Sequence, residues 1–138
     1  MADTLSPAER SRRMGRVRGL NTKPELVVRR LLYRLGYRYR LHQKGLPGRP
    51  DIVFPGRRAV IFVNGCFWHR HPDPNCPLAR LPKSRLDFWR AKLDGNRQRD
   101  LLVLDQLSQA GWRTLTIWEC ELRRLDEVTE RVLGFLPK

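Results

Sequence analysis

The chain of 138 residues fits one domain, long enough to bury a hydrophobic core without disulfide cross-links. Its 28 lysines and arginines exceed its 14 aspartates and glutamates, giving a formal net charge of +14, whereas a magnitude of about 2 to 8 suffices for a merely soluble basic surface. The sequence has neither a long apolar run nor an apolar secretory core, so we expect a cytoplasmic, nucleoid-associated protein that binds nucleic acid and no membrane.

Residues 1–20 form a basic N-terminal arm in this interpretation, ahead of a single domain over residues 21–138. The segment Ser6-Pro7-Ala8-Glu9 has the pattern of a capping box and predicts the start of a short helix. Its candidate DNA contacts are Arg12, Arg13, Met14 and Arg16. A frayed tail is the alternative, because a segment with so few apolar residues cannot pack firmly on a core.

Periodicity and turn residues predict the order of the remaining elements. A second helix-start signal at Asn21 to Glu25 and apolar residues at helical spacing, ended by Gly36, predict a helix over 23–35. We expect strands over 37–41, 52–54, 59–63 and 112–118, and helices over 84–94 (capped by Ser84), 96–110 and 121–136. This order predicts an α/β domain in which helices flank a central mixed sheet.

Three cysteines and one histidine predict a metal site. Cys66, His71 and Cys76 lie in one loop, and Cys120 follows the strand over 112–118, where sheet pairing can bring it alongside. Three thiolates and one imidazole are a standard closed zinc set, and such a zinc ion is structural because no coordination position stays open. Buried structural cysteines with an unrelated histidine are the alternative, although the polar, proline-rich loop cannot supply a hydrophobic core around them.

Asp51 and His69 form the candidate catalytic pair. Asp51 stands at the head of one strand and His69 follows the next, so pairing of the two strands would place both at one end of the sheet. A carboxylate suits Mg²⁺ and a neutral imidazole can take a proton from water, which together suit phosphodiester hydrolysis. A turn or cap residue and a surface histidine are the alternatives. His42 has no partner evident in the sequence, and we expect it to be an ordinary histidine.

Phe67 and Trp68 lie in the same polar loop as the metal ligands. Aromatic pairs usually belong to a core, but apolar side chains pushed between base pairs also deform duplex DNA. Because the loop is expected to be rigid and the protein is strongly basic, we favour insertion into DNA over packing in a core. We therefore interpret this pair as a wedge that enters DNA, and Met14 as a similar candidate in the arm.

Several motifs together resemble the very short patch repair endonuclease family. They are Leu46-Pro47-Gly48-Arg49-Pro50-Asp51, Val60-Ile61-Phe62, Gly65-Cys66-Phe67-Trp68-His69, Phe88-Trp89, Asn96, Arg99-Asp100, Gly111-Trp112 and Trp118-Glu119-Cys120. The resemblance implies a restriction-endonuclease-like fold of the PD-(D/E)xK superfamily, a structural zinc ion and Mg²⁺-dependent nicking on the 5′ side of the thymine in a T:G mismatch. Such a mismatch arises by deamination of 5-methylcytosine. The mismatch specificity is implied by the resemblance alone.

The resemblance also implies roles for individual residues. Asp51 would bind the catalytic magnesium ion, and His69 would be the general base. Glu25 would orient that histidine or a water on the metal, and Asp100 would support the same site. The four residues of the predicted metal site would be the zinc ligands. The aromatic wedge would enter from the major groove, and Met14 from the opposite groove.

Two positions depart from the family pattern. Asn64 replaces the Asp or His common before the Gly-Cys-Phe-Trp-His block, and an amide can neither act as a carboxylate ligand nor carry a proton. Val63 lies where many nucleases of this fold have a second acid, although its backbone carbonyl can still bind magnesium.

These departures keep two alternatives to a mismatch nickase open. One is a zinc-stabilised protein that binds distorted duplex with weak or no cleavage. The other is a nuclease of the same fold for another mismatch, a modified base or a restriction site. For the nickase we expect a monomer whose partners are mismatched double-stranded DNA and other mismatch-repair proteins.

Overall fold

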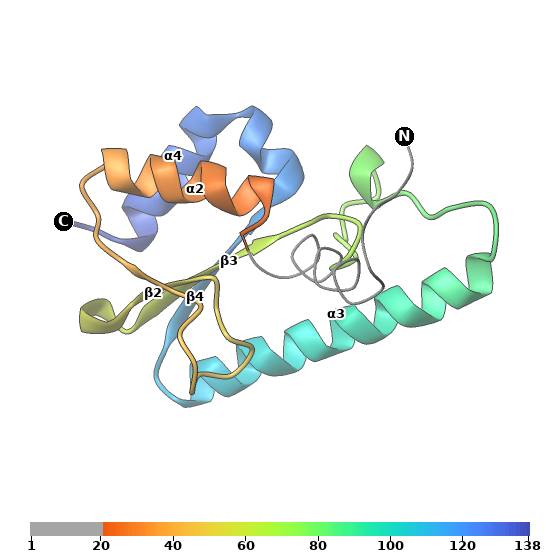
Figure 1. The fold of residues 1–138 in the computed structure, drawn as a ribbon, viewed down its shortest axis with the longest axis horizontal. Helices are drawn as coiled ribbons and strands as arrows, with labels where there is room; N and C mark the ends of the chain where they lie inside the picture. Colours follow the sequence, from red (N-terminus) through yellow and green to blue (C-terminus); the bar gives the residue numbers. More distant parts are fainter. Residues whose placement is uncertain (1–20) are drawn as a thin grey trace, which may run out of the picture.

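A four-stranded mixed sheet lies at the centre of residues 21–138, the part of the chain that the computed structural model describes (Figure 1). The strands are β1 (Arg40–Leu41), β2 (Ile52–Phe54), β3 (Ala59–Asn64) and β4 (Arg113–Trp118), in that spatial order. The first three pair antiparallel, and β3 and β4 pair parallel. The expected mixed α/β architecture is therefore confirmed. The predicted contacts of the arm, Arg12, Arg13, Met14 and Arg16, lie outside the described residues.

Helices cover both faces of the sheet. They are α2 (Lys23–Arg34), α3 (Leu86–Gln109) and α4 (Leu125–Phe135), with short 3-10 segments at Pro55–Arg57, Pro77–Ala79 and Glu119–Arg123. Figure 1 shows α2 and α4 together on one face and α3 on the other. Along β3, Ile61 packs in the core beneath α2 and α4, and Val60 packs with Leu107 of α3. The strand is thus buried on both faces, as its unbroken apolar sequence predicts.

Helix α2 follows its sequence signals closely. The side chain of Thr22 accepts a hydrogen bond from the backbone N–H of Glu25, and Pro24 occupies the first turn, where no intrahelical donor is needed. The helix ends before Gly36, which has a φ of +94°. The predicted helix is confirmed to within one residue.

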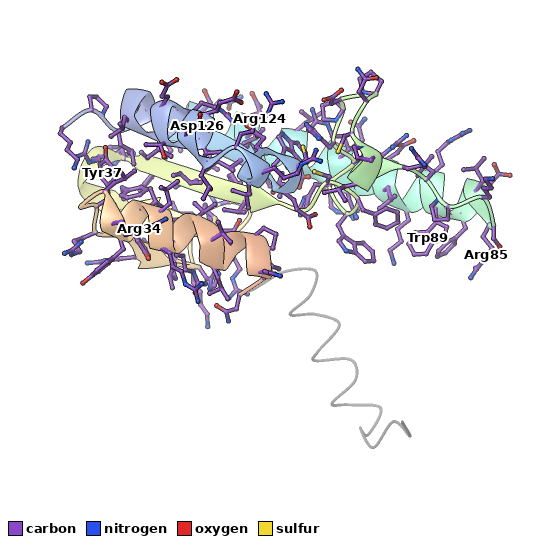
Figure 2. All side chains as sticks on the ribbon, turned by 90° about the horizontal axis from the view of Figure 1, so that it is seen from above. Arg34, Tyr37, Arg85, Trp89, Arg124 and Asp126 are labelled. Carbon is purple, nitrogen blue, oxygen red and sulfur yellow. The ribbon has the colours of Figure 1, made fainter. Side chains whose placement is uncertain are left out.

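The two helices expected over 84–94 and 96–110 are one continuous helix, so that prediction is wrong. A glycine within a helix costs only about 1 kcal/mol, and packing offsets this cost at Gly95, since Leu93 is fully buried and Asn96 donates a hydrogen bond to the Trp68 carbonyl. Ser84 is not the cap either: the cap position is Arg85, which makes no side-chain cap bond. The N-terminal part of α3 extends beyond the sheet, where Figure 2 shows Arg85 and Trp89.

Two further boundaries differ from expectation by more than one residue. The strand predicted over 37–41 is limited to Arg40–Leu41, because Tyr37 turns into the core and donates a hydrogen bond to the Leu136 carbonyl. The last helix begins at Leu125 and not at 121, because a 3-10 segment precedes it and the Glu121 side chain accepts from the Trp118 backbone N–H. Within residues 21–138, no helix has the length and apolar character needed to cross a membrane.

Candidate active site and metal-binding cluster

A cavity of about 900 Å³ opens where β2 begins and β3 ends. Its lining includes six of the residues singled out from the sequence: Asp51, Val63, Asn64, Trp68, His69 and Asp100. The antiparallel pairing of β2 with β3 explains why Asp51 and His69 share this end of the sheet, as expected. Basic side chains of Lys23, Arg49 and Arg97 also line the cavity and suit a polyanionic ligand.

Asp51 is held in place from the strand beside it. The backbone N–H of Val63 donates to Oδ2 of Asp51 over 2.7 Å, which leaves the second carboxylate oxygen for a cation. Burial raises the pKa of Asp51 to about 6, although the Val63 N–H and the neighbouring His42 and His69 act in the opposite direction. A divalent cation at this carboxylate would favour its ionised form, so the donor set fits a metal ion that prefers oxygen ligands.

His69 is oriented by Asp100. Its Nδ1 lies 2.8 Å from Oδ2 of Asp100, a residue of α3 that is 31 positions away in the sequence. Beside an ionised carboxylate, Nδ1 carries the proton and Nε2 keeps its lone pair. The arrangement therefore leaves Nε2 able to accept a proton from a water molecule.

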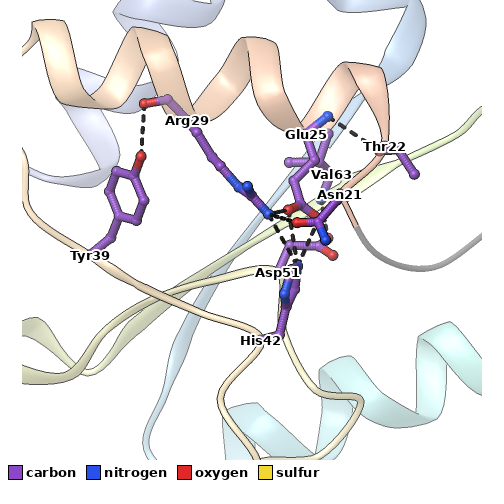
Figure 3. Close-up of polar contacts among 8 residues, drawn as sticks. All are labelled: Asn21, Thr22, Glu25, Arg29, Tyr39, His42, Asp51 and Val63. Atoms are coloured by element: carbon purple, nitrogen blue, oxygen red, sulfur yellow. Dashed lines mark hydrogen bonds and ion pairs between the residues drawn. The ribbon is translucent and has the colours of Figure 1, made fainter. Parts of the chain in front are cut away.

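Glu25 pairs with His42, whereas the resemblance implies that it orients His69 or a water on the metal. The Glu25 side chain is only 1% exposed, and Nε2 of His42 lies 3.1 Å and 3.0 Å from its two carboxylate oxygens (Figure 3). Arg29 forms an ion pair with the same carboxylate. The structure thus gives His42 a partner that the sequence alone does not reveal. The signal that could have revealed it is the β1–β2 pairing, since Leu41 opposite Ile52 places His42 beside Asp51.

The four predicted metal ligands come together. One ligand atom each from Cys66, His71, Cys76 and Cys120 lies within 4.8 Å of all the others. The parallel pairing of β3 with β4 brings Cys120 beside Cys66, whose sulfur accepts a hydrogen bond from the Cys120 backbone N–H over 3.4 Å. Burial is the main cause that raises the pKa of both thiols. A cation would offset that effect and stabilise the thiolates, so the cluster is suited to a metal ion.

The aromatic pair in the loop between Cys66 and Cys76 belongs to a larger cluster. The ring centroids of Phe67 and Trp68 are 5.1 Å apart, and Trp89 of α3 lies 5.5 Å from Phe67 and 6.2 Å from Trp68. All three rings are half-buried. Phe88, which is 45% exposed, extends the cluster. The contact with Trp89 was missed in the sequence because it depends on the course of α3.

Comparison with known proteins gives matches along nearly the whole chain. A family described as DNA mismatch endonuclease Vsr matches residues 2–75. The type II nicking enzyme V.XorIIP of Xanthomonas oryzae pv. oryzae is 51% identical over 136 residues, covering 99% of this chain and 98% of that protein. The type II nicking enzyme V.NmeAIP of Neisseria meningitidis is 37% identical over 132 residues, or 96% and 92% of the two chains. The DNA mismatch endonuclease Vsr of Escherichia coli is 39% identical over 133 residues, or 96% and 83%.

Proposed function

The chain belongs to the DNA mismatch endonuclease Vsr family and is a DNA endonuclease, and from this premise we propose that it nicks duplex DNA on the 5′ side of the thymine in a T:G mismatch, with magnesium. The nick would start very short patch repair after deamination of 5-methylcytosine. The observation that carries the proposal is the cavity that Asp51 shares with the His69–Asp100 pair. We also propose that the mixed α/β fold is restriction-endonuclease-like. The protein would act in the cytoplasm, at the nucleoid, where duplex DNA lies.

His69 would supply the proton transfer. Its Nε2 takes a proton from a water molecule, the water oxygen bonds to phosphorus, and one P–O bond of the DNA backbone breaks. The leaving oxygen then takes a proton from solvent water and becomes a hydroxyl group. Asp100 stabilises the imidazolium that forms. Asp51 and the backbone carbonyl of Val63 would hold the magnesium ion, which when bound supplies positive charge to the phosphate and the leaving oxygen.

Zinc is the metal that we propose for the cysteine and histidine cluster. Three thiolates with one imidazole leave no open position, so its role is structural. It would brace the loop that carries Phe67, Trp68 and His69. The wedge would thus be held rigid beside the base, and the basic arm would contact the same duplex.

A strand-resolved cleavage assay on a panel of duplexes tests this function. The panel contains T:G, U:G and other mismatches and a fully paired control, each with Mg²⁺ and with EDTA. We expect a Mg²⁺-dependent nick in the thymine strand of T:G. The variants Asp51→Ala and His69→Ala should lose nicking while they keep zinc and DNA binding. Full nicking activity in either variant would contradict the assignment of Asp51 and His69 to the nuclease site.

Two other functions compete with this one. Asn64, only 7% exposed at the end of β3, places an amide in the cavity wall and favours a distorted-duplex binder with weak or no cleavage. Binding to T:G duplex without any Mg²⁺-dependent nick would support it, and a faster Asn64→Asp variant would show that the amide limits the chemistry. Because relatives are named type II nicking enzymes, a same-fold nuclease for another mismatch, a modified base or a restriction site also competes, and the panel would expose it.

A further inference from the structure

His42 has an unusual backbone at a position tied to the candidate active site. Its φ is +45°, in the left-handed region that non-glycine residues seldom adopt. Its backbone N–H donates to the carbonyl oxygen of Asp51 over 3.1 Å and so extends the pairing of β1 with β2 by one residue. Strained backbone that persists at such a place is a sign of a functional constraint.

The imidazole of His42 reaches from this fixed backbone to Glu25 on α2. Its Nε2 lies almost equally far, 3.1 Å and 3.0 Å, from the two carboxylate oxygens. One ligand atom each from Glu25, His42 and Asp51 lies within 4.8 Å of the other two. Two carboxylates this close repel each other when both are ionised, so an N–H donor on Glu25 helps to keep it beside Asp51.

A metal ion held by these three residues is a less fitting account. The Nη2 of Arg29 forms an ion pair with Glu25 and lies 3.5 Å from Nε2 of His42 (Figure 3). Its guanidinium also donates to Oδ1 of Asn21 over 2.7 Å. The Glu25 carboxylate is therefore already paired with a fixed positive charge, which opposes a metal ion held between Glu25 and His42.

We propose that His42 is a positioning residue of the nuclease site, which holds the Glu25 carboxylate beside Asp51 and so fixes Asp51 for its magnesium ion. The backbone contact secures His42 to the start of β2, and the side-chain contact secures α2 to the same point. This inference rests on the proposed function. It assigns no proton transfer to His42 and no contact between His42 and DNA.

Two variants that differ by one methylene group test the proposal. Asparagine tolerates the left-handed backbone well, but in His42→Asn the amide is too short to reach Glu25. Glutamine tolerates that backbone less well, but in His42→Gln an amide N–H can replace the Nε2–H. The Mg²⁺ concentration for half-maximal nicking should rise about tenfold in His42→Asn and return most of the way to the parent value in His42→Gln. Zinc content should stay the same.

A second measurement separates this proposal from the nickase assignment. Binding of Mn²⁺ to the DNA-free protein, followed by electron paramagnetic resonance, should be weaker in His42→Asn and restored in His42→Gln. If the parent nicks no duplex, the proposed function fails, and the Mn²⁺ result still decides the role of His42. An unchanged metal requirement in His42→Asn, or a glutamine variant no better than the asparagine variant, would overturn the inference.

Discussion

The Nδ1 atom of His69 lies 2.8 Å from Oδ2 of Asp100, and this contact joins the loop after β3 to the middle of α3. One turn earlier on the same helix, Asn96 donates to the backbone carbonyl of Trp68 over 2.9 Å. A single helix therefore orients both the candidate base and the aromatic residue next to it. The continuity of α3 through Gly95 joins this part of the helix to Trp89, which contacts Phe67 and Trp68.

Asp100→Asn should slow nicking by about 10-fold to 100-fold. The new amide can donate to Nδ1 of His69, which moves the imidazole proton to Nε2 and removes the acceptor for the proton of water. His69→Ala should be slower still, by about 10² to 10⁴ relative to the parent. Single-turnover rates at saturating Mg²⁺ measure both effects. Asp105→Asn, on an exposed part of α3, is the control, and a rate for Asp100→Asn equal to that control would contradict the role of Asp100.

Asp51→Asn should stabilise the protein when magnesium is omitted, although it abolishes nicking. The pKa of Asp51 is raised by burial from 3.8 to about 6, so its ionised form disfavours the folded state once the pH exceeds both values. At about pH 8 the variant should have the larger free energy of unfolding, by up to about 3 kcal/mol. The difference should shrink as the pH falls from about 6 and vanish below about 4, where the carboxyl is neutral in both states. Asparagine can still accept from the Val63 N–H, so this contact survives.

Urea unfolding of parent and variant across this pH range measures the effect. Added Mg²⁺ should narrow the gap at pH 8, because only the parent gains a cation at the site. If the parent is more stable than Asp51→Asn at pH 8 without magnesium, the ionised Asp51 carboxylate does not destabilise the folded state, and the prediction is wrong.

Cys120→Ser should lose stoichiometric zinc and unfold at a lower temperature. The ligand comes from beyond β4, so its loss releases the Cys66 to Cys76 loop from the neighbouring strand. Metal analysis of freshly purified protein and thermal unfolding measure the two effects. Ser108→Ala, on the exposed end of α3, provides the matched surface change. Parent protein that contains no stoichiometric zinc would count against the assignment of all four ligands.

Trp89→Ala should weaken binding to mismatched duplex about tenfold or more, because aromatic stacking on a base contributes about 1 to 3 kcal/mol. The ring also supports Phe67 and Trp68, so its removal loosens the wedge. Fluorescence anisotropy with labelled duplexes, without magnesium, measures the affinity. Leu102→Ala, an exposed change elsewhere on α3, should bind like the parent. An equal loss on paired and mismatched duplex would mean that Trp89 contributes only to general DNA binding.

Much of the scaffold could be predicted from local sequence signals. Thr22 and Pro24 define the start of α2, and the apolar run of β3 identifies a strand that is buried on both faces. These signals are reliable because caps and periodicity act between residues a few positions apart. Asp51 and His69, placed at the ends of neighbouring strands, line one cavity as expected, and the resemblance added Glu25 and Asp100. The division at residue 20, the DNA contacts of the arm and the roles of Asn64 and Val63 stay predictions.

The sequence by itself determined the members of the cysteine and histidine cluster, the charge that favours DNA and the strand ends at which Asp51 and His69 lie. Only the tertiary structure decided which side chains pair with each other: Asp100 lies against His69, and His42 lies against Glu25. These partners are separated by 31 and 17 positions, beyond the reach of any local pattern. Their contacts depend on how α2 and α3 pack against the sheet and on the register of β1 with β2, which the chain settles only when it buries its core.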